Sequence, residues 1–153
     1  MDILHYQKEF LSYLESKQWI HEPKNLYEPI DYILKLGGKR MRPVLTLMAA
    51  DIFSSDFKKA LPAALAVEVF HNFTLIHDDI MDAAPLRRGK ATVHEKWDTN
   101  TGILSGDAML ILAYQYFENY EPAVFQKLAK LFSKTALEVC DGQQLDVDFE
   151  TRN

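Results

Sequence analysis

Three aspartates lie close together in the sequence, at Asp78, Asp79 and Asp82, and two arginines follow at Arg87 and Arg88. Like charges one turn apart on a helix repel each other by about 0.2–0.5 kcal/mol per pair even when exposed. A divalent metal bound to the carboxylates would remove this repulsion. The planar guanidinium of arginine fits the oxygens of a phosphate group, so the arginines indicate what the metal would hold. The segment therefore predicts a metal site that binds a diphosphate.

Helical geometry decides which of these side chains can act together. At 100° per residue, Asp78 and Asp82 lie about 40° apart on one face, whereas Asp79 lies about 100° from Asp78. His71 returns to nearly the same face, about 10 Å away along the helix axis. An acidic helix end is more often solvated surface, but here the flanking residues are apolar and the next segment is cationic. We therefore expect that Asp78 and Asp82 can share metal ions.

A second cationic cluster lies upstream, where Lys39 and Arg42 follow a pair of glycines and precede Pro43. If a helix begins here, its free backbone N–H groups and the positive end of its dipole add affinity for an anion. A basic turn before a helix is usually just solvated surface, so the cluster is weak evidence by itself. It gains weight because the aspartate segment independently calls for a second anion partner.

The elements that must position these residues are predicted to be helices. Six glycines and six prolines punctuate the sequence, and between them apolar residues recur at spacings of three and four. We expect an all-α fold in a single domain over residues 1–153. The first two predicted helices end near residues 21–23 and at residues 37–38. The third has Pro43 in its first turn, and the fourth runs from Pro62 to the aspartates. The fifth begins at Gly102 and a turn at residues 105–107, and the last runs from Glu121-Pro122 to about Asp146.

Composition excludes several classes of function. The net charge of −5 and the lack of a long basic stretch argue against a nucleic-acid partner. A single cysteine, Cys140, excludes an intrachain disulfide and fits a reducing, cytoplasmic setting. The N-terminus shows no signal-peptide pattern. The longest apolar run, residues 60–70, is broken by Pro62 and Glu68 and is shorter than the roughly 20 residues of a membrane span.

Taken together, the motifs resemble those of the trans-isoprenyl diphosphate synthases, the farnesyl and geranylgeranyl diphosphate synthase family. The sequence contains G-G-K-R-x-R-P at 37–43, D-D-x-x-D at 78–82 with R-R-G at 87–89, and G-Q-x-x-D at 142–146, in this order. The resemblance implies an isoprenoid synthase-type helical bundle with a deep central cavity, a requirement for Mg²⁺ and, usually, a homodimer.

The resemblance also implies a role for each matching residue. Asp78 and Asp82 would ligate Mg²⁺ ions that bridge to the allylic diphosphate, with Asp79 in support. Arg87 would contact the same diphosphate, and Asp146 would assist the metal site through water. Breaking the allylic C–O bond leaves a carbocation and a diphosphate, so catalysis consists mainly of stabilising the leaving group by metals and guanidiniums. The expected catalytic residues are therefore Asp78, Asp82 and Arg87.

The second substrate, isopentenyl diphosphate, would be held by a separate set of side chains. Its double bond would attack the carbocation, and a proton would then be lost to the departing diphosphate in an apolar cavity that excludes water. Gln143 would line this cavity near the metal site. The residues implied for the diphosphate of isopentenyl diphosphate are Lys39, Arg42, His71 and Arg88.

Product length is expected to depend on Phe73 and Thr74, the fifth and fourth residues before the first aspartate. Bulky residues at these positions block the growing chain in this family. The small Thr74 and aromatic Phe73 resemble the pattern of some geranylgeranyl diphosphate synthases, so we expect that product first and farnesyl diphosphate second. The helical wheel puts Phe73 about 140° from Asp78, so its place under the cavity is implied by the resemblance alone.

One feature of the family is missing from this sequence. Family members carry a second aspartate-rich motif downstream, which holds another Mg²⁺, and the chain stops at Asn153 without it. We therefore expect the N-terminal half of a synthase, inactive or nearly so by itself. Such a piece would expose apolar helix faces and associate with a copy of itself, a separate C-terminal half or a full-length partner.

Other classes of protein explain fewer of these residues. An HD-type metal phosphohydrolase could use His71, His77 and Asp78, but it gives no account of the paired arginines. Class I terpene cyclases share the aspartate motif but have no need of Lys39, Arg42 and His71. A non-catalytic subunit of a heteromeric synthase stays open, because the intact motif counts against it and the missing half counts for it.

Overall fold

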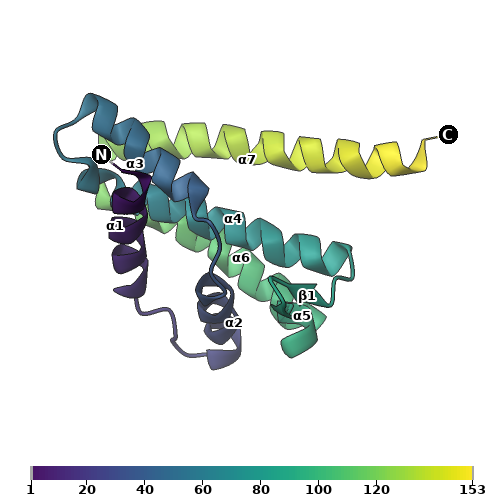
Figure 1. Ribbon diagram of the computed structural model, residues 1–153. Helices are drawn as coiled ribbons and strands as arrows, with labels where there is room; N and C mark the ends of the chain where they lie inside the picture. Colours follow the sequence, from purple (N-terminus) through teal and green to yellow (C-terminus); the bar gives the residue numbers. More distant parts are fainter. Residues whose placement is uncertain (1, 153) are drawn as a thin grey trace. The chain divides into compact units, whose positions relative to one another are not determined.

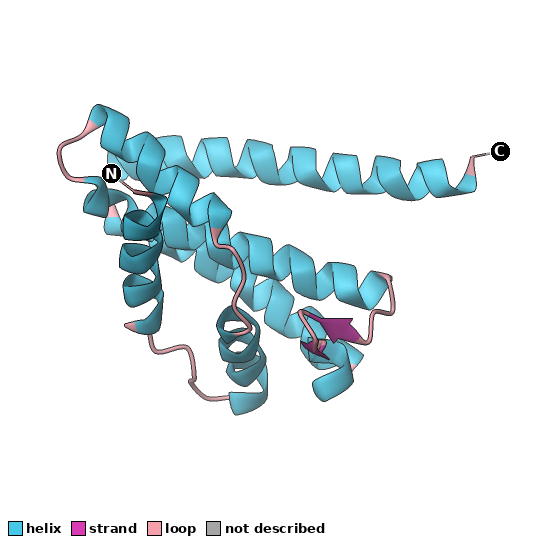
Figure 2. Cartoon of the chain, in the orientation of Figure 1, coloured by secondary structure: helices cyan, strands magenta, loops and turns pink. Residues whose placement is uncertain are grey.

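A computed structural model describes residues 2–152, which are mostly helical (Figures 1 and 2). The prediction of an all-α fold is confirmed. The other regular structure in this range is a short antiparallel pair, β1 (Leu86–Arg87) and β2 (Lys90–Ala91), with Leu86 opposite Ala91. The helices, in chain order, are α1 (Ile3–Glu15), α2 (Lys24–Lys35), α3 (Met41–Phe53), the 3₁₀ turn η1 (Phe57–Ala60), α4 (Leu61–Met81), α5 (Val93–Lys96), α6 (Thr99–Tyr116), the 3₁₀ turn η2 (Phe117–Asn119) and α7 (Pro122–Thr151).

The chain forms two compact units, one up to Tyr116 and one from Phe117 onward. The first unit contains α1 to α6 and both short strands. The second contains η2 and α7, and within it the rings of Phe117 and Phe132 meet edge to face with centroids 5.2 Å apart. No described side chain of α7 is buried. No helix among residues 2–152 is both long enough and apolar enough to cross a membrane.

The first unit is built around α4 and α6, which run side by side in Figure 1. Pro62 stands in the first turn of α4, where its missing N–H costs nothing because that group has no partner inside the helix. The helix ends at Met81 with Asp82 as its C-cap, so the predicted span from Pro62 to the aspartates is confirmed. The largest fully buried side chains of this unit are Phe10, Ile30, Ile33, Leu34, Leu47, Leu65, Ile76 and Met109.

Two glycines allow α6 to lie close to α4. A Cβ on Gly102 would be 2.9 Å from the Cδ1 of Ile80, and a Cβ on Gly106 would overlap the imidazole of His77. The predicted turn at residues 105–107 is wrong, because this segment lies inside α6. Both glycines therefore serve close packing between helices, and neither ends a helix.

The ends of two other helices also differ from the prediction. The first helix ends at Glu15 and not near residues 21–23, and α7 continues beyond Asp146 to Thr151. The second helix does end before Gly37 and Gly38, which adopt positive φ angles of 85° and 125°. These angles suit glycine and turn the chain sharply into α3.

Gly106→Ala is expected to lower the free energy of unfolding by about 1–3 kcal/mol, because the new methyl group must displace His77 or separate α4 from α6. Urea denaturation followed by circular dichroism measures the change. Gly142→Ala is the matched control, since Gly142 lies inside α7 with open space around it. The control should be neutral or more stable by about 0.5–1 kcal/mol. Equal destabilisation by the two changes would contradict the close packing.

Candidate functional site

The three aspartates lie at the C-terminal end of α4, where Asp82 is the C-cap residue. Asp82 is exposed, Asp78 is half-buried and Asp79 is buried. Burial raises the pKa of Asp78, and the negative charge of Asp82 raises it further, against the opposing effect of Arg87. The end of a helix already carries a partial negative charge. A cation at this end would therefore relieve both sources of repulsion.

Asp79 is held by Arg87 in a bidentate ion pair. Nε of Arg87 donates to Oδ2 of Asp79 at 2.7 Å, and the terminal nitrogen donates to Oδ1 at 2.8 Å. The β1–β2 turn brings Arg87 back to α4, and Arg88 and Gly89 in this turn have positive φ angles of 53° and 75°. The two expected roles, metal support by Asp79 and diphosphate binding by Arg87, stay predictions. The ion pair fixes the orientation of the arginine that would take part.

The basic loop comprises residues 37–40 and the first two residues of α3, and it contacts α4 through His71. NH1 of Arg42 lies 3.3 Å from Nε2 of His71, and both Arg42 and Lys39 are exposed. Burial lowers the pKa of His71, and the positive charge of Arg42 lowers it further, while Glu68 opposes the shift. A neutral His71 accepts from Arg42 at Nε2 and keeps its proton on Nδ1.

His71 should titrate below its ordinary pKa of about 6.5. The unfolded chain then binds this proton more readily than the folded chain, so His71 contributes stability above about pH 6.5, which is lost as the pH falls through the lower folded pKa. NMR titration of the His71 ring protons measures the folded pKa directly. Arg42→Met should raise it, because the neighbouring positive charge is removed. A folded pKa at or above 6.5 would contradict this arrangement.

Arg88 connects the hairpin to the basic loop. NH1 of Arg88 donates to the carbonyl oxygen of Gly37, and a Cβ on Gly38 would lie 2.8 Å from the guanidinium carbon. Burial and the charges of Arg40 and Arg87 lower the pKa of Arg88. The structure thus brings together two cationic segments through a contact between residues that are 51 positions apart in the sequence.

A buried ion pair under the basic loop was not predicted from the sequence. Arg40 donates from NH1 to Oε1 of Glu68 at 2.6 Å and from NH2 to the carbonyl oxygen of Leu34 at 2.5 Å. Nδ2 of Asn72 lies 3.3 Å from the same Glu68 oxygen. The sequence contains one indication of this ion pair, the presence of Glu68 within the apolar run of α4, since a buried carboxylate needs a cation nearby.

Phe73 and Thr74 are half-buried on α4. The ring centroid of Phe73 lies 5.5 Å from that of Phe70 and 4.8 Å from that of His77. The hydroxyl of Thr74 donates to the carbonyl oxygen of His71 at 2.7 Å. Nε2 of His77 also lies 3.2 Å from the carbonyl oxygen of Ile103.

Gln143 and Asp146 lie on α7 with exposed side chains. They belong to the second unit, whereas the other candidate residues belong to the first. Their expected roles near the metal stay predictions.

The aspartates fit a metal that takes most of its ligands from elsewhere. Among residues 2–152, no group of three His, Cys, Asp or Glu side chains is arranged to hold a metal ion. Mg²⁺, however, usually binds one or two carboxylates and completes its shell with water and substrate phosphates. Asp78 and Asp82 supply two carboxylates whose mutual repulsion a divalent cation would relieve. The donor set therefore suits a magnesium ion that also binds a phosphate group.

Comparison with known proteins gives a consistent family. Residues 23–153 match the polyprenyl synthetase family model. The geranylgeranyl diphosphate synthase of Methanosarcina mazei is 45% identical over 135 residues, which cover 87% of this chain and 42% of that protein.

Solved structures give the same result. A crystal structure of a geranylgeranyl pyrophosphate synthase is 62% identical with a TM-score of 0.97, over 100% of this chain and 47% of that one. The geranylgeranyl pyrophosphate synthetase of Geoglobus acetivorans is 38% identical with a TM-score of 0.87, over 99% of this chain and 50% of that one. The chain therefore spans about half the length of the relatives it matches.

Proposed function

Because the chain belongs to the polyprenyl synthetase family, we propose that it carries the first half of the active site of a prenyltransferase. The reaction would condense an allylic diphosphate with isopentenyl diphosphate, form geranylgeranyl or farnesyl diphosphate and release diphosphate. One observation carries this proposal: paired carboxylates at the end of α4 lie in the same compact unit as two linked cationic segments. Two diphosphate substrates would need two such binding regions, one formed with metal ions on the carboxylates and one formed by the cationic side chains.

Asp78 and Asp82 would hold the magnesium ions at the end of α4. When bound, Mg²⁺ supplies positive charge that stabilises the departing diphosphate. Arg87 would contact the same diphosphate, and its ion pair with Asp79 keeps the guanidinium in one orientation before the substrate arrives. Preorganised charge of this kind costs no rearrangement at the moment the C–O bond breaks.

The diphosphate of isopentenyl diphosphate would bind to the basic loop and its neighbours on α4 and the hairpin. Lys39 and Arg42 are exposed to solvent, and Arg88 donates to the carbonyl oxygen of Gly37 in the same loop. His71 would donate from Nδ1, because its Nε2 accepts from Arg42. Several donors on different elements suit a diphosphate, whose charge is spread over many oxygens.

The rest of the active site would come from outside this chain. Several apolar side chains along α7 are exposed, and this chain covers only 42% and 47% of the length of two relatives that it matches. We propose that a C-terminal half or a second subunit supplies it, and that the 153 residues alone are inactive or nearly so. The exposed apolar side chains of α7 include Leu131, Leu137, Leu145, Val147 and Phe149.

An activity assay with labelled isopentenyl diphosphate and an allylic diphosphate tests the proposal. The 153-residue chain alone should release no prenyl product. A chimera in which this chain replaces the matching part of the Methanosarcina mazei synthase should form product only with Mg²⁺ or a similar divalent ion. An inactive but folded chimera would refute the proposed function, and turnover by the isolated chain would refute the need for a second half.

Phe73→Ala in this chimera is expected to lengthen the product by at least one isoprene unit. The ring of Phe73 lies on α4 five residues before Asp78 and packs against Phe70 and His77, and its loss would leave room for a longer chain. Chromatography of the dephosphorylated products measures their length. Phe53→Ala is the control, because that ring is 89% exposed at the end of α3. Unchanged product length in the Phe73 variant would rule out this residue as the limit.

A further inference from the structure

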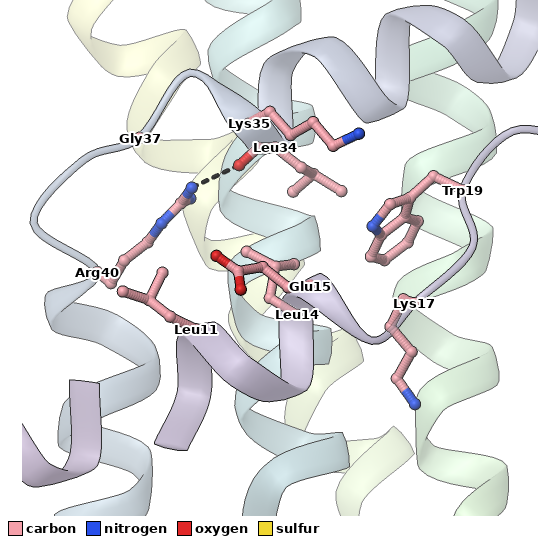
Figure 3. A pocket seen from close by; sticks show the side chains of 9 residues that line it. All are labelled: Leu11, Leu14, Glu15, Lys17, Trp19, Leu34, Lys35, Gly37 and Arg40. Atoms are coloured by element: carbon pink, nitrogen blue, oxygen red, sulfur yellow. Dashed lines mark hydrogen bonds between the residues drawn. The ribbon is translucent and has the colours of Figure 1, made fainter. Parts of the chain in front are cut away.

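The basic loop is fixed from below by a buried network that the substrates would not touch. Arg40 has a left-handed φ of 51°, an uncommon conformation for a residue with a side chain. Its guanidinium is directed inward, whereas Lys39 and Arg42 on either side are exposed. Figure 3 shows the side chain reaching the carbonyl oxygen of Leu34 at the end of α2. One residue thus ties the loop to the helix before it.

The same guanidinium ties the loop to α4. Arg40 and Glu68 form an ion pair of 2.6 Å whose side chains are each 3% exposed. Asn72, one turn further along α4, donates to the carbonyl and carboxylate oxygens of Glu68 and so holds the carboxylate. His71 lies between Glu68 and the aspartates on this helix, so the network fixes the loop to the element that carries the other proposed ligand of the same substrate.

This network is a poor source of stability. Removing two charges from water costs about as much as their attraction returns, and such pairs can often be replaced by apolar residues without loss. The cost is increased here, because Nε of Arg40 and Oδ1 of Asn72 are buried without hydrogen-bond partners. The Arg40–Glu68 pair adds backbone strain and desolvation but little stability. Its role is better explained by the position in which it holds the basic loop.

We infer that Arg40 and Glu68 are positioning residues for isopentenyl diphosphate. This inference rests on the proposed function. The pair fixes the basic loop to α4, and Arg88 fixes it again at the carbonyl of Gly37. Lys39 and Arg42 are thereby held in register with His71 before substrate binds. Arg40 and Glu68 would not contact the substrate, because their side chains are each 3% exposed.

The double variant Arg40→Met/Glu68→Met tests the inference in the chimera, since it removes the pair without leaving a buried charge. It should raise the KM for isopentenyl diphosphate by about 10–100-fold and change the KM for the allylic diphosphate by less than about two-fold. Arg40→Lys keeps the charge but loses the planar guanidinium that donates to two acceptors, so it should give an intermediate KM for isopentenyl diphosphate. If the double variant only lowers the fraction of active enzyme, kcat will fall and both KM values will stay unchanged. This result would overturn the inference.

Lys58→Met/Glu9→Met is the matched control, because it removes an ion pair of 2.9 Å that is far more exposed. It should leave both KM values within about two-fold. Hydrogen exchange of the Val44 amide, which donates to the carbonyl oxygen of Arg40 at 3.2 Å, gives a readout that needs no activity, and this amide should exchange about ten-fold faster in the Arg40/Glu68 double variant. Unchanged exchange would overturn the positioning role. If the unsubstituted chimera makes no product, the proposed function fails and the exchange result alone decides the role of the pair.

Discussion

Asp78→Asn is expected to lower the kcat of the chimera by about 10³-fold or more, since it removes one of two carboxylates that would hold the metal against the leaving diphosphate. Asparagine has nearly the same size, so the change removes charge and leaves packing intact. Steady-state assays over a range of Mg²⁺ concentrations measure the effect. The apparent Mg²⁺ requirement should rise, because a neutral amide is a weaker ligand than a carboxylate.

Asp82→Asn should act in the same direction, because Asp78 and Asp82 both lie at the end of α4. Glu95→Gln is the control, as its side chain is 55% exposed and belongs to none of the motifs. It should leave kcat within about two-fold, as expected for a surface change. Full activity of either aspartate variant at low Mg²⁺ would show that the metal binds elsewhere.

Arg87→Met is expected to lower the free energy of unfolding by about 2–4 kcal/mol, because it leaves the buried carboxylate of Asp79 without its bidentate partner. The expected value lies toward the lower part of the range for buried pairs, since the arginine side chain is 25% exposed. Urea denaturation of the 153-residue chain measures the loss. Asp79→Asn added to the same chain should recover most of it, because the unpaired charge disappears.

Arg88→Met is the matched control for this experiment. Arg88 is also a hairpin arginine, but it donates to a backbone carbonyl and leaves no buried charge when removed. It should cost less than about 1.5 kcal/mol, the usual contribution of one hydrogen bond. A similar loss for the two arginines would mean that the hairpin as a whole, and not the pair with Asp79, carries the stability.

Local patterns in the sequence predicted those helix ends that are set by a single residue type, such as proline or glycine. Pro62 marked the start of α4, and the glycines at 37–38 marked the end of α2. The glycines of α6 were misread because glycine serves equally as a turn residue and as a contact point between helices. Only the position of α4 against α6 distinguishes these uses, and that position depends on tertiary packing.

The candidate site was predictable where it follows helical periodicity and not where it depends on pairing across the fold. The wheel separated Asp79 from Asp78 and Asp82, and Asp79 is indeed the buried member of the three. The partner of Asp79 comes from a hairpin, and the partner of Arg40 lies 28 residues away on α4. No short-range rule predicts such partners. Sequence therefore identified the charged groups, and the fold decided which of them neutralise each other.

The division of the chain at Tyr116 has a consequence for biosynthesis. The basic loop, the aspartates and the hairpin all belong to the first unit and are held by contacts within it. Because domains fold as units from the N-terminus during translation, we expect this unit to form while α7 is still emerging from the ribosome. A nascent chain would then assemble the charged groups proposed to bind diphosphate before α7 has been added.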